Sequence, residues 1–367
     1  MKIGIPREVR EGEARVGMTP AGVRELVAMG HQVFVEHAAG ERSGFADQAY
    51  IDAGADLVYS PQEVYWRAEM IVKVVRPTAA EFDLLQDGAT LVGFLQLASI
   101  RQHKIETLLR KRVTAIALES IATDNGDLPV IHAMSQIGGR MMPGLAARYL
   151  EIEGGGNGVL LAGVPGVPPA EVIIIGAGVF GQVAARAFTR IGASVYVLDR
   201  QVRQLLATER RCEPGRVSTM MAHPENIAKV LRFADVVVTA ASNAGQRAPM
   251  LIDDALLRTM RPGSVIMDVS INNGGCVASS RPTSHADPVF RYAGITHYCV
   301  PNIPAAVART ATHALANITW PFIEHIVSRG VDLAIAENQA VARGVWAHRG
   351  ELVQFAGAAD QEPIAWD

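Results

Sequence analysis

The sequence predicts an α/β protein made of two doubly wound units with a cleft between them. Short apolar, β-branched runs alternate with amphipathic helical stretches along most of the chain, which is typical of parallel sheets covered by helices. A stretch rich in glycine and proline, residues 153–169, divides these runs into two series. The chain has 367 residues, which is enough for two domains that each bury a core.

The first series of strands occupies the first third of the chain. A helix is predicted between its first two strands, over residues 21–29, and similar amphipathic stretches follow. Because parallel strands need crossover connections, this alternation predicts a parallel sheet with helices on both faces. The predicted strands are residues 3–6, 32–36, 70–75, 90–95 and 114–118.

The second series begins after the glycine- and proline-rich stretch. A long helix over residues 134–153 precedes it, the sequence after Pro304 is mostly helical, and residues 357–367 are predicted to be a loose tail. We therefore predict that residues 1–130 and 305–367 form one domain and residues 131–304 the other. The predicted strands of the second series begin at Val172 and continue at residues 194–198, 235–239, 264–269 and 296–300.

A G-x-G-x-x-G pattern follows the first strand of the second series. Gly176 allows a tight turn, Gly178 lets the backbone approach a pyrophosphate, and Gly181 lets the helix pack closely on the strand. The helix that starts near Val179 offers unpaired N–H groups and the positive end of its dipole to the phosphates. Since a strand precedes the pattern and a helix follows it, the sequence predicts a Rossmann-like domain that binds a dinucleotide.

The choice of dinucleotide depends on the end of the next strand. Asp199 lies there, where a carboxylate accepts hydrogen bonds from the adenosine ribose and repels a 2′-phosphate. This favours NAD over NADP. Arg200 follows directly, so the alternative stays open at this point.

Composition excludes several classes of function. Apolar residues make up 49% and charged residues 19% of the chain, as in a globular protein, and the formal net charge of −3 gives no reason to expect a nucleic-acid partner. The three cysteines are scattered, which argues against a disulfide framework and against a metal site. The charged N-terminus and the lack of a long apolar run predict a cytoplasmic protein without a membrane span.

Several motifs together resemble the alanine dehydrogenase family, from the first residue to about residue 330. They are MKIGIPRE at residues 1–8, EARV at 13–16, TPAGV at 19–23, MS at 134–135, GVPG at 163–166, GGC at 274–276, SRPTS at 280–284, NIP at 302–304 and RT at 309–310. The resemblance, which extends to the N-terminal part of transhydrogenases, implies a cofactor domain inserted into a substrate domain. It also implies a homo-oligomer, often a hexamer.

The resemblance assigns roles to particular residues. Arg15 would bind the carboxylate of a small-molecule substrate, a task that suits its planar, two-pronged guanidinium, although an arginine in a salt bridge is the more common case. We predict cofactor contacts from the glycine turn with Val179 and from Asp199 with Arg200 at the end of the next strand. Further predicted cofactor contacts are Ser135, Ala241, Ser242 and Asn302.

Three positions depart from the family pattern. Relatives carry two lysines at the end of one strand, and this chain, which reads Lys73-Val74-Val75 there, has Val75 in place of the second lysine. It has Gln96 where relatives carry a histidine, and Asn272 where they carry an aspartate. We count Lys73 and Val75 with Arg15 as predicted substrate contacts, and Gln96 and Asn272 as occupants of the catalytic positions. The chain is thus predicted to be a divergent member that lacks the usual catalytic lysine, histidine and aspartate.

These replacements bear on the chemistry. Oxidative deamination requires proton transfers after hydride transfer, and glutamine and asparagine do not titrate near neutral pH. His132 is a candidate for a relocated base, because imidazole titrates near neutrality, but a buried and satisfied or a solvent-facing histidine is the commoner case. The same two alternatives apply to His313, where relatives often have tyrosine.

The function predicted from these observations is an NAD-dependent oxidoreductase that acts on a non-standard amino-acid or imine-type carboxylate. Two alternatives stay open: a catalytically inactive NAD(H)-binding protein that serves as a sensor or structural subunit, and an ordinary L-alanine dehydrogenase. A partner that hands hydride to a nucleotide on another subunit is disfavoured, because Arg15 is retained.

Overall fold

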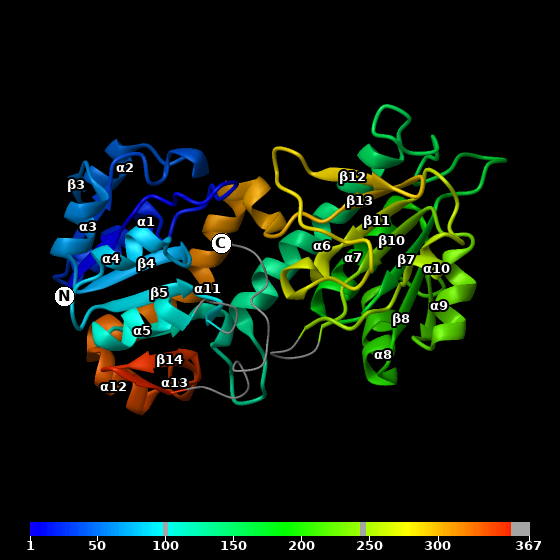
Figure 1. The fold of residues 1–367 in the computed structure, drawn as a ribbon. Helices are drawn as coiled ribbons and strands as arrows, with labels where there is room; N and C mark the ends of the chain where they lie inside the picture. The colour runs from blue at the N-terminus through cyan, green and yellow to red at the C-terminus, as the bar shows by residue number, and fades with distance from the viewer. Residues whose placement is uncertain (98–101, 243–246, 354–367) are drawn as a thin grey trace. The chain divides into compact units, whose positions relative to one another are not determined.

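The computed structural model describes residues 1–97, 102–242 and 247–353 (Figure 1). The chain forms two compact units: unit 1 comprises Met1–Met134 and Pro304–Asp367, and unit 2 comprises Ser135–Ile303. Unit 2 is thus inserted in the sequence of unit 1, close to the predicted boundaries. The predicted tail at residues 357–367 lies outside the described residues.

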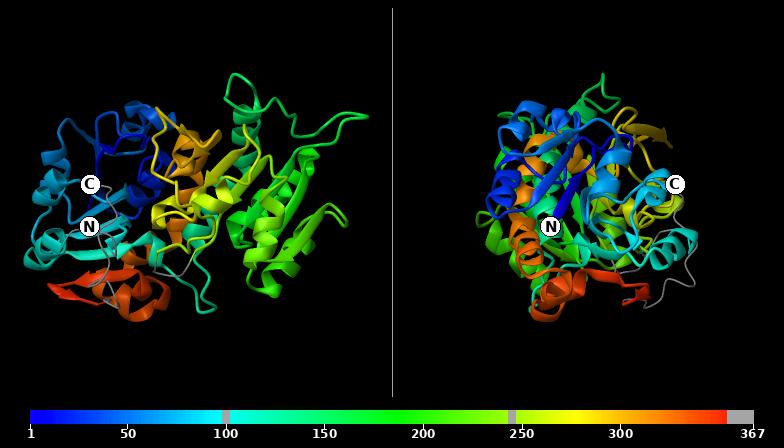
Figure 2. Two further views of the ribbon diagram at one scale, coloured as in Figure 1. Left: turned by 45° about the vertical axis from the view of Figure 1, so that its right-hand side comes forward. Right: turned by 90° about the vertical axis from the view of Figure 1, so that its left-hand side faces the viewer.

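Unit 1 is built on a sheet with the strand order β15-β14-β6-β5-β4-β1-β2-β3. The six strands from β1 to β6 are parallel, while β14 and β15 add an antiparallel hairpin at the edge next to β6. In Figures 1 and 2 this hairpin, near the red end of the colour scale, lies beside strands from early in the chain. The strands are β1 Lys2–Ile5, β2 Gln32–Glu36, β3 Asp56–Val58, β4 Met70–Val75, β5 Thr90–Phe94, β6 Thr114–Ala117, β14 Val345–His348 and β15 Glu351–Leu352.

Helices connect these strands and cover both faces of the sheet (Figure 1). Caps explain several of their starts: Thr19, Ser60 and Thr78 each accept a hydrogen bond from a first-turn N–H, and Pro20 and Pro61 stand at the first helical position. The helices of this unit are α1 Pro20–Ala28, α2 Asp47–Ile51, α3 Pro61–Arg67, α4 Ala79–Leu84, α5 Gln102–Arg110, α11 Ala308–Arg329, α12 Val331–Glu337 and α13 Gln339–Gly344.

Unit 2 repeats the same winding with the strand order β12-β13-β11-β10-β7-β8-β9. All of its strands are parallel except β12, which pairs antiparallel with β13 at one edge. The long helix α6, Pro129–Leu150, leads into the unit. The remaining elements are β7 Glu171–Ile175, α7 Val179–Ile191, β8 Ser194–Asp199, α8 Val202–Arg211, β9 Val217–Met221, α9 Pro224–Leu231, β10 Val236–Thr239, α10 Asp254–Leu257, β11 Val265–Asp268, β12 Val289–Tyr292 and β13 Ile295–Tyr298.

The sheet of unit 2 buries both of its faces. Val172 and Ile174 of β7 pack into one hydrophobic cluster with Phe188 of α7, whereas Ile173 and Ile175 pack into another cluster with residues of α9 and α10. Neighbouring residues of a strand point to opposite faces, so a strand buried on both sides is apolar throughout. This explains why β7 reads as an uninterrupted apolar run.

The predicted fold class, α/β with two doubly wound parallel sheets, is confirmed by both sheets. The sequence did not predict β3, β9 and β12, and it predicted a mostly helical segment after Pro304, where β14 and β15 also form. The strands β9 and β12 lie at sheet edges and are only partly buried, and β3 is a three-residue edge strand. Such strands lack the apolar run that identifies a central strand.

Candidate functional site

The glycine-rich turn after β7 has the geometry that a bound pyrophosphate needs. Gly176 adopts φ +109°, and a Cβ added there would lie 2.5 Å from the backbone oxygen of Ala240. A Cβ on Gly181 would lie 1.9 Å from the backbone oxygen of Gly176, so α7 packs this closely only because the side chain is absent. Gly178, the N-cap of α7, differs, because a Cβ there would meet nothing within 4 Å. This open space adjoins the first turn of α7, which begins at Val179 and whose N–H groups lack intrahelical partners.

Asp199, the last residue of β8, anchors this turn. One of its carboxylate oxygens accepts a hydrogen bond from the Ala177 N–H at 2.7 Å, and the other accepts one from the Gln201 N–H at 2.8 Å. A carboxylate has about four lone-pair positions, so both oxygens can still accept a ribose hydroxyl. Asp199 therefore fixes the turn, and its contact with the cofactor ribose stays a prediction. Arg200, next to it, is exposed.

The loop that follows β10 lies at the same edge of the sheet. β7 and β10 are neighbours at the point where the strand order reverses, which is where open α/β sheets bind nucleotides. Ala241 is half-buried, Ser242 is exposed, and the backbone oxygen of Ala241 accepts a hydrogen bond from Ser270 Oγ at 2.7 Å. The predicted cofactor contacts Ala241 and Ser242 are thus brought to the edge that holds the glycine turn.

Asp268, which the sequence did not single out, organises the carboxyl ends of two strands. It is buried, and its carboxylate accepts hydrogen bonds from Thr239 Oγ1 at 2.8 Å and from the Cys276 N–H at 2.8 Å. It also caps the short 3₁₀ turn Val269–Asn273. This arrangement fixes the turn that presents Asn272, which is exposed. The available signal in the sequence is an aspartate that ends an apolar strand.

Arg15 lies on the segment that follows β1 and is only 4% exposed. Its guanidinium makes two hydrogen bonds to Glu13, from Nε at 2.7 Å and from Nη2 at 2.6 Å. Nη1 is 3.4 Å from the sulfur of Met134, and the Phe94 ring centre lies 5.9 Å from the guanidinium carbon. Within the described part of the chain, a thioether sulfur is the only acceptor that Nη1 is found to contact, and thioethers accept weakly. Nη1 is therefore the most weakly engaged nitrogen of this guanidinium, and its contact with a substrate stays a prediction. The role of Glu13 in holding it was not predicted.

Lys73 lies inside unit 1 and is 1% exposed. Its Nζ is 2.6 Å from an oxygen of Glu81 and 3.2 Å from an oxygen of Glu8, and the Tyr65 hydroxyl donates to Glu81 at 3.1 Å. Burial alone would raise the pKa of Glu81, but Lys73 and the donors of Thr78 hold this pKa below its usual value. The structure gives no support to a direct contact between Lys73 and the substrate, because the ammonium is enclosed by two carboxylates.

Val75 and Gln96 lie at the carboxyl ends of adjacent strands. The pairing of β4 with β5 shifts register between Val72 and Val75, and Val75 then pairs with Phe94. Since the strand is irregular there, the strict alternation that would place Lys73 and Val75 on one face does not apply. Val75 is half-buried, and Gln96 is exposed with φ +46°.

A carboxyl group beside Gln96 was also missed. Glu119 follows β6, and its carboxylate accepts hydrogen bonds from the Leu95 N–H at 3.1 Å and from the Gln96 N–H at 2.5 Å. Burial raises the pKa of Glu119 to about 7, although these backbone donors and the charge of Arg76 oppose that rise. Unit 1 thus holds a carboxyl group of raised pKa, on the turn after β6, in contact with the backbone of Leu95 and Gln96 beyond the end of β5.

The two histidines considered as replacement bases lie elsewhere. His132 is half-buried in α6 and stands two positions before Met134, so it lies about 200° around the helix from the residue that contacts Arg15. The structure therefore gives no support to His132 as a base at Arg15. His313 is exposed on α11, and its ring packs edge-on against Phe45 at 5.2 Å.

Two further predicted cofactor contacts belong to unit 2. Ser135 lies in α6 and is partly exposed. Asn302 adopts φ +58°, and its backbone oxygen accepts a hydrogen bond from His285 Nε2 at 3.2 Å. Both roles stay predictions.

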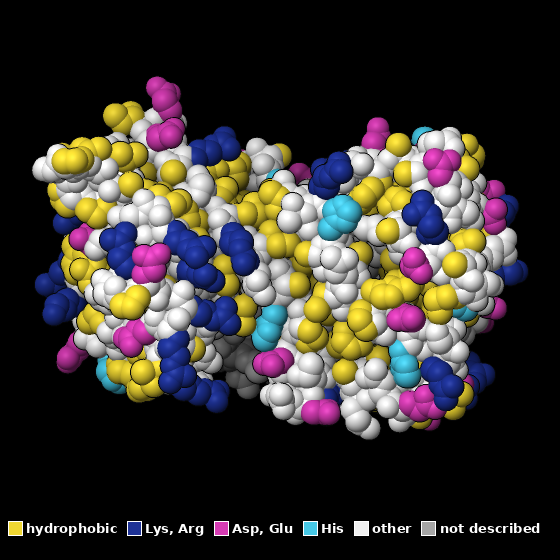
Figure 3. Space-filling view, turned by 180° about the vertical axis from the view of Figure 1, so that it is seen from behind, with side chains coloured by type: hydrophobic (Ala, Val, Ile, Leu, Met, Phe, Trp, Pro, Cys, Tyr) yellow, Lys and Arg dark blue, Asp and Glu magenta, His cyan; other side chains and the backbone are white. Residues whose placement is uncertain are grey.

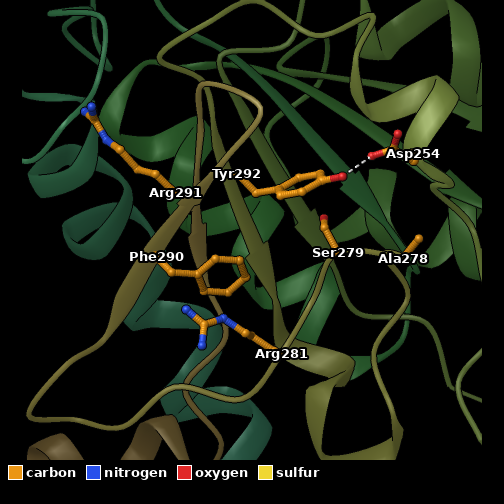
Figure 4. Close-up of a pocket in the computed structure, with 7 residues that line it drawn as sticks. All are labelled: Asp254, Ala278, Ser279, Arg281, Phe290, Arg291 and Tyr292. Carbon is orange, nitrogen blue, oxygen red and sulfur yellow. Dashed lines mark hydrogen bonds between the residues drawn. The ribbon is translucent and has the colours of Figure 1, made fainter.

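A pocket of about 430 Å³ lies at the β12 edge of unit 2 (Figure 4). Tyr292 donates a hydrogen bond to Asp254 at 2.7 Å, and the guanidinium carbon of Arg281 lies 4.5 Å from the ring centre of Phe290. Tyr292 pairs with Ile295 at the start of β13, whereas the glycine turn follows the carboxyl end of β7. None of the predicted site residues lines this pocket, so we do not assign the reaction to it. Its lining residues are Asp254, Ala278, Ser279, Arg281, Phe290, Arg291 and Tyr292.

The surface and the cysteines add little to the site. Lys and Arg side chains gather on part of the face in Figure 3, with Asp and Glu side chains among them. Burial raises the pKa of the Cys276 thiol to about 11 and that of Cys299 to about 12.

No helix in the described ranges is long and apolar enough to cross a membrane. No group of three or more His, Cys, Asp or Glu residues that could hold a metal ion occurs in residues 1–97, 102–242 and 247–353.

Comparison with known proteins relates both units to dehydrogenases. The family model "Alanine dehydrogenase/PNT, N-terminal domain" matches residues 4–138, and "Alanine dehydrogenase/PNT, C-terminal domain" matches residues 143–355. Alanine dehydrogenase from Methanococcus maripaludis is 42% identical over 359 residues, which cover 98% of this chain and 96% of the relative. The alanine dehydrogenase from Halomonas elongata is also 42% identical, over 358 residues.

Solved structures agree with this relationship. An L-alanine dehydrogenase structure superposes with a TM-score of 0.91 at 42% identity, covering 96% of this chain and 97% of that chain. A transhydrogenase from Sinorhizobium meliloti superposes with a TM-score of 0.81 at 23% identity, which shows a shared fold.

The residues of unit 2 fit a nicotinamide dinucleotide. Gly178 leaves open the space that a Cβ would fill, α7 begins beside it, and Asp199 ends the next strand. These are the parts that hold a pyrophosphate and a ribose in a dinucleotide-binding domain. The chain therefore belongs to the alanine dehydrogenase/PNT family, and its cofactor is NAD.

Proposed function

We propose that this chain is an NAD-dependent dehydrogenase that interconverts a small amino acid and its 2-oxo acid, with L-alanine as the first substrate to test. Full-length relatives at 42% identity carry the name alanine dehydrogenase, and this supports the ordinary reaction better than an altered one. The structural observation that carries the proposal is Arg15. Its buried guanidinium is held by Glu13, while Nη1 faces only a weak acceptor in the described structure.

In this proposal each unit has one task. Arg15 binds the substrate carboxylate through charge-assisted hydrogen bonds, and Glu13 keeps the guanidinium from turning. Gly178 and the first turn of α7 hold the pyrophosphate, and Asp199 holds the ribose. NAD, when bound, accepts the hydride from the substrate. By holding the substrate and the cofactor in a fixed orientation, the chain would raise the rate of hydride transfer between them.

A second candidate is a related oxidoreductase with a different carboxylate substrate. It is favoured by Val75, Gln96 and Asn272, which stand where the family pattern has a lysine, a histidine and an aspartate. A positioned acid or base contributes about 10²- to 10⁴-fold in rate, and none of these three side chains supplies one. An imine or amide substrate needs fewer proton transfers and would tolerate the change.

A third candidate is an NAD(H)-binding protein without turnover. It predicts cofactor binding together with no reaction on any amino acid or 2-oxo acid. A subunit that hands hydride to a nucleotide on another chain is less well supported, because Arg15 would then have no carboxylate to bind.

One experiment separates these candidates. The purified chain is titrated with NADH, followed by nicotinamide fluorescence, and is then assayed with NAD and a panel of L-amino acids, and with NADH, ammonia or amines and a panel of 2-oxo acids. Turnover of L-alanine and pyruvate supports the ordinary reaction, and turnover of another pair alone supports the altered substrate. Tight NADH binding without turnover on either panel contradicts both dehydrogenase proposals.

Restoring the family residues tests the three replacements directly. The triple variant Val75→Lys, Gln96→His, Asn272→Asp is compared with wild type, with Gln86→His, at an exposed glutamine, as the matched control. A large gain in alanine turnover in the triple variant alone supports the altered substrate. Equal alanine turnover in wild type and triple variant shows that the replacements do not limit the ordinary reaction.

We also propose that the chain forms a homo-oligomer, with a hexamer as the expected size. Leu160, Val164 and Val167 lie in the segment between α6 and β7 and are 62%, 53% and 58% exposed. A second copy of the chain would remove these apolar side chains from water, which is favourable. Light scattering on the wild type and on a variant with all three changed to serine tests this; a monomeric wild type contradicts it.

A further inference from the structure

Glu119 joins the carboxyl ends of two neighbouring strands in unit 1. It lies in the turn Leu118–Ser120 that directly follows β6, and its two carboxylate oxygens accept hydrogen bonds from consecutive N–H groups beyond β5. Oε2 is 3.1 Å from the Leu95 nitrogen, and Oε1 is 2.5 Å from the Gln96 nitrogen. One side chain therefore sets the path of the chain at Gln96.

The backbone at Gln96 needs such support. Its φ of +46° lies in the left-handed region of the backbone, which residues other than glycine, asparagine and aspartate rarely adopt. A strained conformation persists only where neighbouring groups fix it, and such positions concentrate at functional sites. The glutamine itself is exposed.

We propose that Glu119 is a positioning residue for the dehydrogenase reaction, because its carboxylate fixes the backbone of Gln96 and thereby aims the Gln96 side chain at the substrate. The proposal rests on the proposed function, which places the ends of β4 and β5 near the carboxylate held by Arg15. Phe94, next to the guanidinium of Arg15, is two residues before Gln96 on the same strand end.

The charge that acts on Glu119 is that of Arg76, and α13, which contacts the turn Leu118–Ser120, carries Arg343. From the end of β4, Arg76 lowers the pKa of Glu119 through its charge, against the larger opposite effect of burial. From α13, Arg343 donates hydrogen bonds to the Ala122 oxygen and to Asp124. Both arginines stay charged over the physiological range of pH.

Proton uptake would weaken the hold on Gln96. A protonated carboxyl group keeps one good acceptor oxygen and turns the other into a hydroxyl, so it cannot accept both N–H groups equally well. Because burial raises the pKa of Glu119 to about 7, this change falls near neutral pH. Gln96 should be fixed above pH 7 and released below it.

The first test requires no turnover. The amide resonances of Leu95 and Gln96 are followed from pH 5.5 to 8.5 in wild type, in Glu119→Gln and in the control Glu106→Gln, which changes an exposed glutamate of α5. We expect both amides to shift with a midpoint near 7 in wild type and in the control, and not in Glu119→Gln. Amides that do not titrate, or that titrate equally in Glu119→Gln, overturn the proposal whether or not the chain has activity.

The second test asks whether Glu119 acts through Gln96. We expect Glu119→Gln and Gln96→Ala each to lower kcat on the order of tenfold, since a small misplacement at a site costs up to about 10²-fold. The double variant should be no slower than the slower single variant, and Glu119→Gln should also lose the rise of kcat between pH 6 and 8. Independent, multiplicative effects would show that Glu119 serves the fold alone. Absence of turnover in all four proteins would instead contradict the proposed function, while the amide titration would still decide the positioning role.

Discussion

Replacing Gly178 by alanine should separate cofactor binding from stability. Gly178 has φ −67° and ψ −173°, which alanine adopts without strain, and an added Cβ meets nothing within 4 Å. The folded unit therefore accommodates the methyl group. A glycine replaced at such a compatible position typically gains about 0.4–1 kcal/mol, because the unfolded chain loses freedom. We expect the melting temperature of Gly178→Ala to equal or slightly exceed that of the wild type.

The same methyl group should weaken NADH binding. It would occupy the space through which the pyrophosphate approaches the first turn of α7. Loss of one hydrogen bond to a charged group costs about 1.5–3 kcal/mol, which corresponds to an increase of about 10- to 150-fold in Kd. Fluorescence titration with NADH measures this change, and calorimetric melting without cofactor measures stability.

Two further glycines of unit 2 serve as controls. Gly144→Ala makes the same chemical change at an exposed position of α6 where an added Cβ also meets nothing within 4 Å, so both affinity and stability should be retained. Gly181→Ala would place a Cβ 1.9 Å from a backbone oxygen, so stability should fall together with affinity. If Gly178→Ala binds NADH as tightly as Gly144→Ala does, the cofactor does not approach this turn and the assignment of the pyrophosphate site is refuted.

Three other predictions follow from unit 1. Arg15→Lys should raise KM for the substrate carboxylate at least about tenfold without changing NADH affinity, because lysine lacks the guanidinium fork; steady-state kinetics and NADH titration measure both values. Lys73→Met should destabilise unit 1 by about 3–5 kcal/mol, because Glu8 and Glu81 would be left without their cation. Urea unfolding followed by tryptophan emission reports this, since Trp66, Trp320 and Trp346 belong to unit 1. The pKa of Glu119 is raised from 4.5 to about 7 in the folded chain, so this group favours folding at low pH and loses that contribution as the pH rises through 7. The free energy of unfolding of wild type, relative to that of Glu119→Gln, should therefore fall by up to about 3 kcal/mol from pH 4 to 8. A difference between the two unfolding free energies that does not change with pH would contradict this.

The central strands could be predicted because burial on both faces dictates their composition. β2 and β4 begin and end at the predicted residues, and β7 and β10 differ from prediction by a residue or so. β14 could not be predicted in this way. It follows three helices and joins its sheet only by pairing with β6, more than two hundred residues earlier in the chain, and a single sequence carries no local signal for such a pairing.

The sequence by itself determined the glycine turn between β7 and α7, because each part of it is a local requirement. A tight turn, an open approach and a close helix each need a glycine, and these needs fall on Gly176, Gly178 and Gly181 within one strand–turn–helix unit. The acidic residue at the end of the next strand belongs to the same pattern. No distant contact was needed to recognise it.

Only the tertiary structure decided which charged side chains are available for the reaction. The motif around Lys73 predicts a substrate contact like that of Arg15, yet two carboxylates from other segments enclose the Lys73 ammonium. Glu119 carried no motif, yet it holds the backbone of Gln96 from a neighbouring strand. The physical reason is that burial, pairing and pKa depend on groups brought together by strand order, and strand order connects residues that are far apart in the sequence.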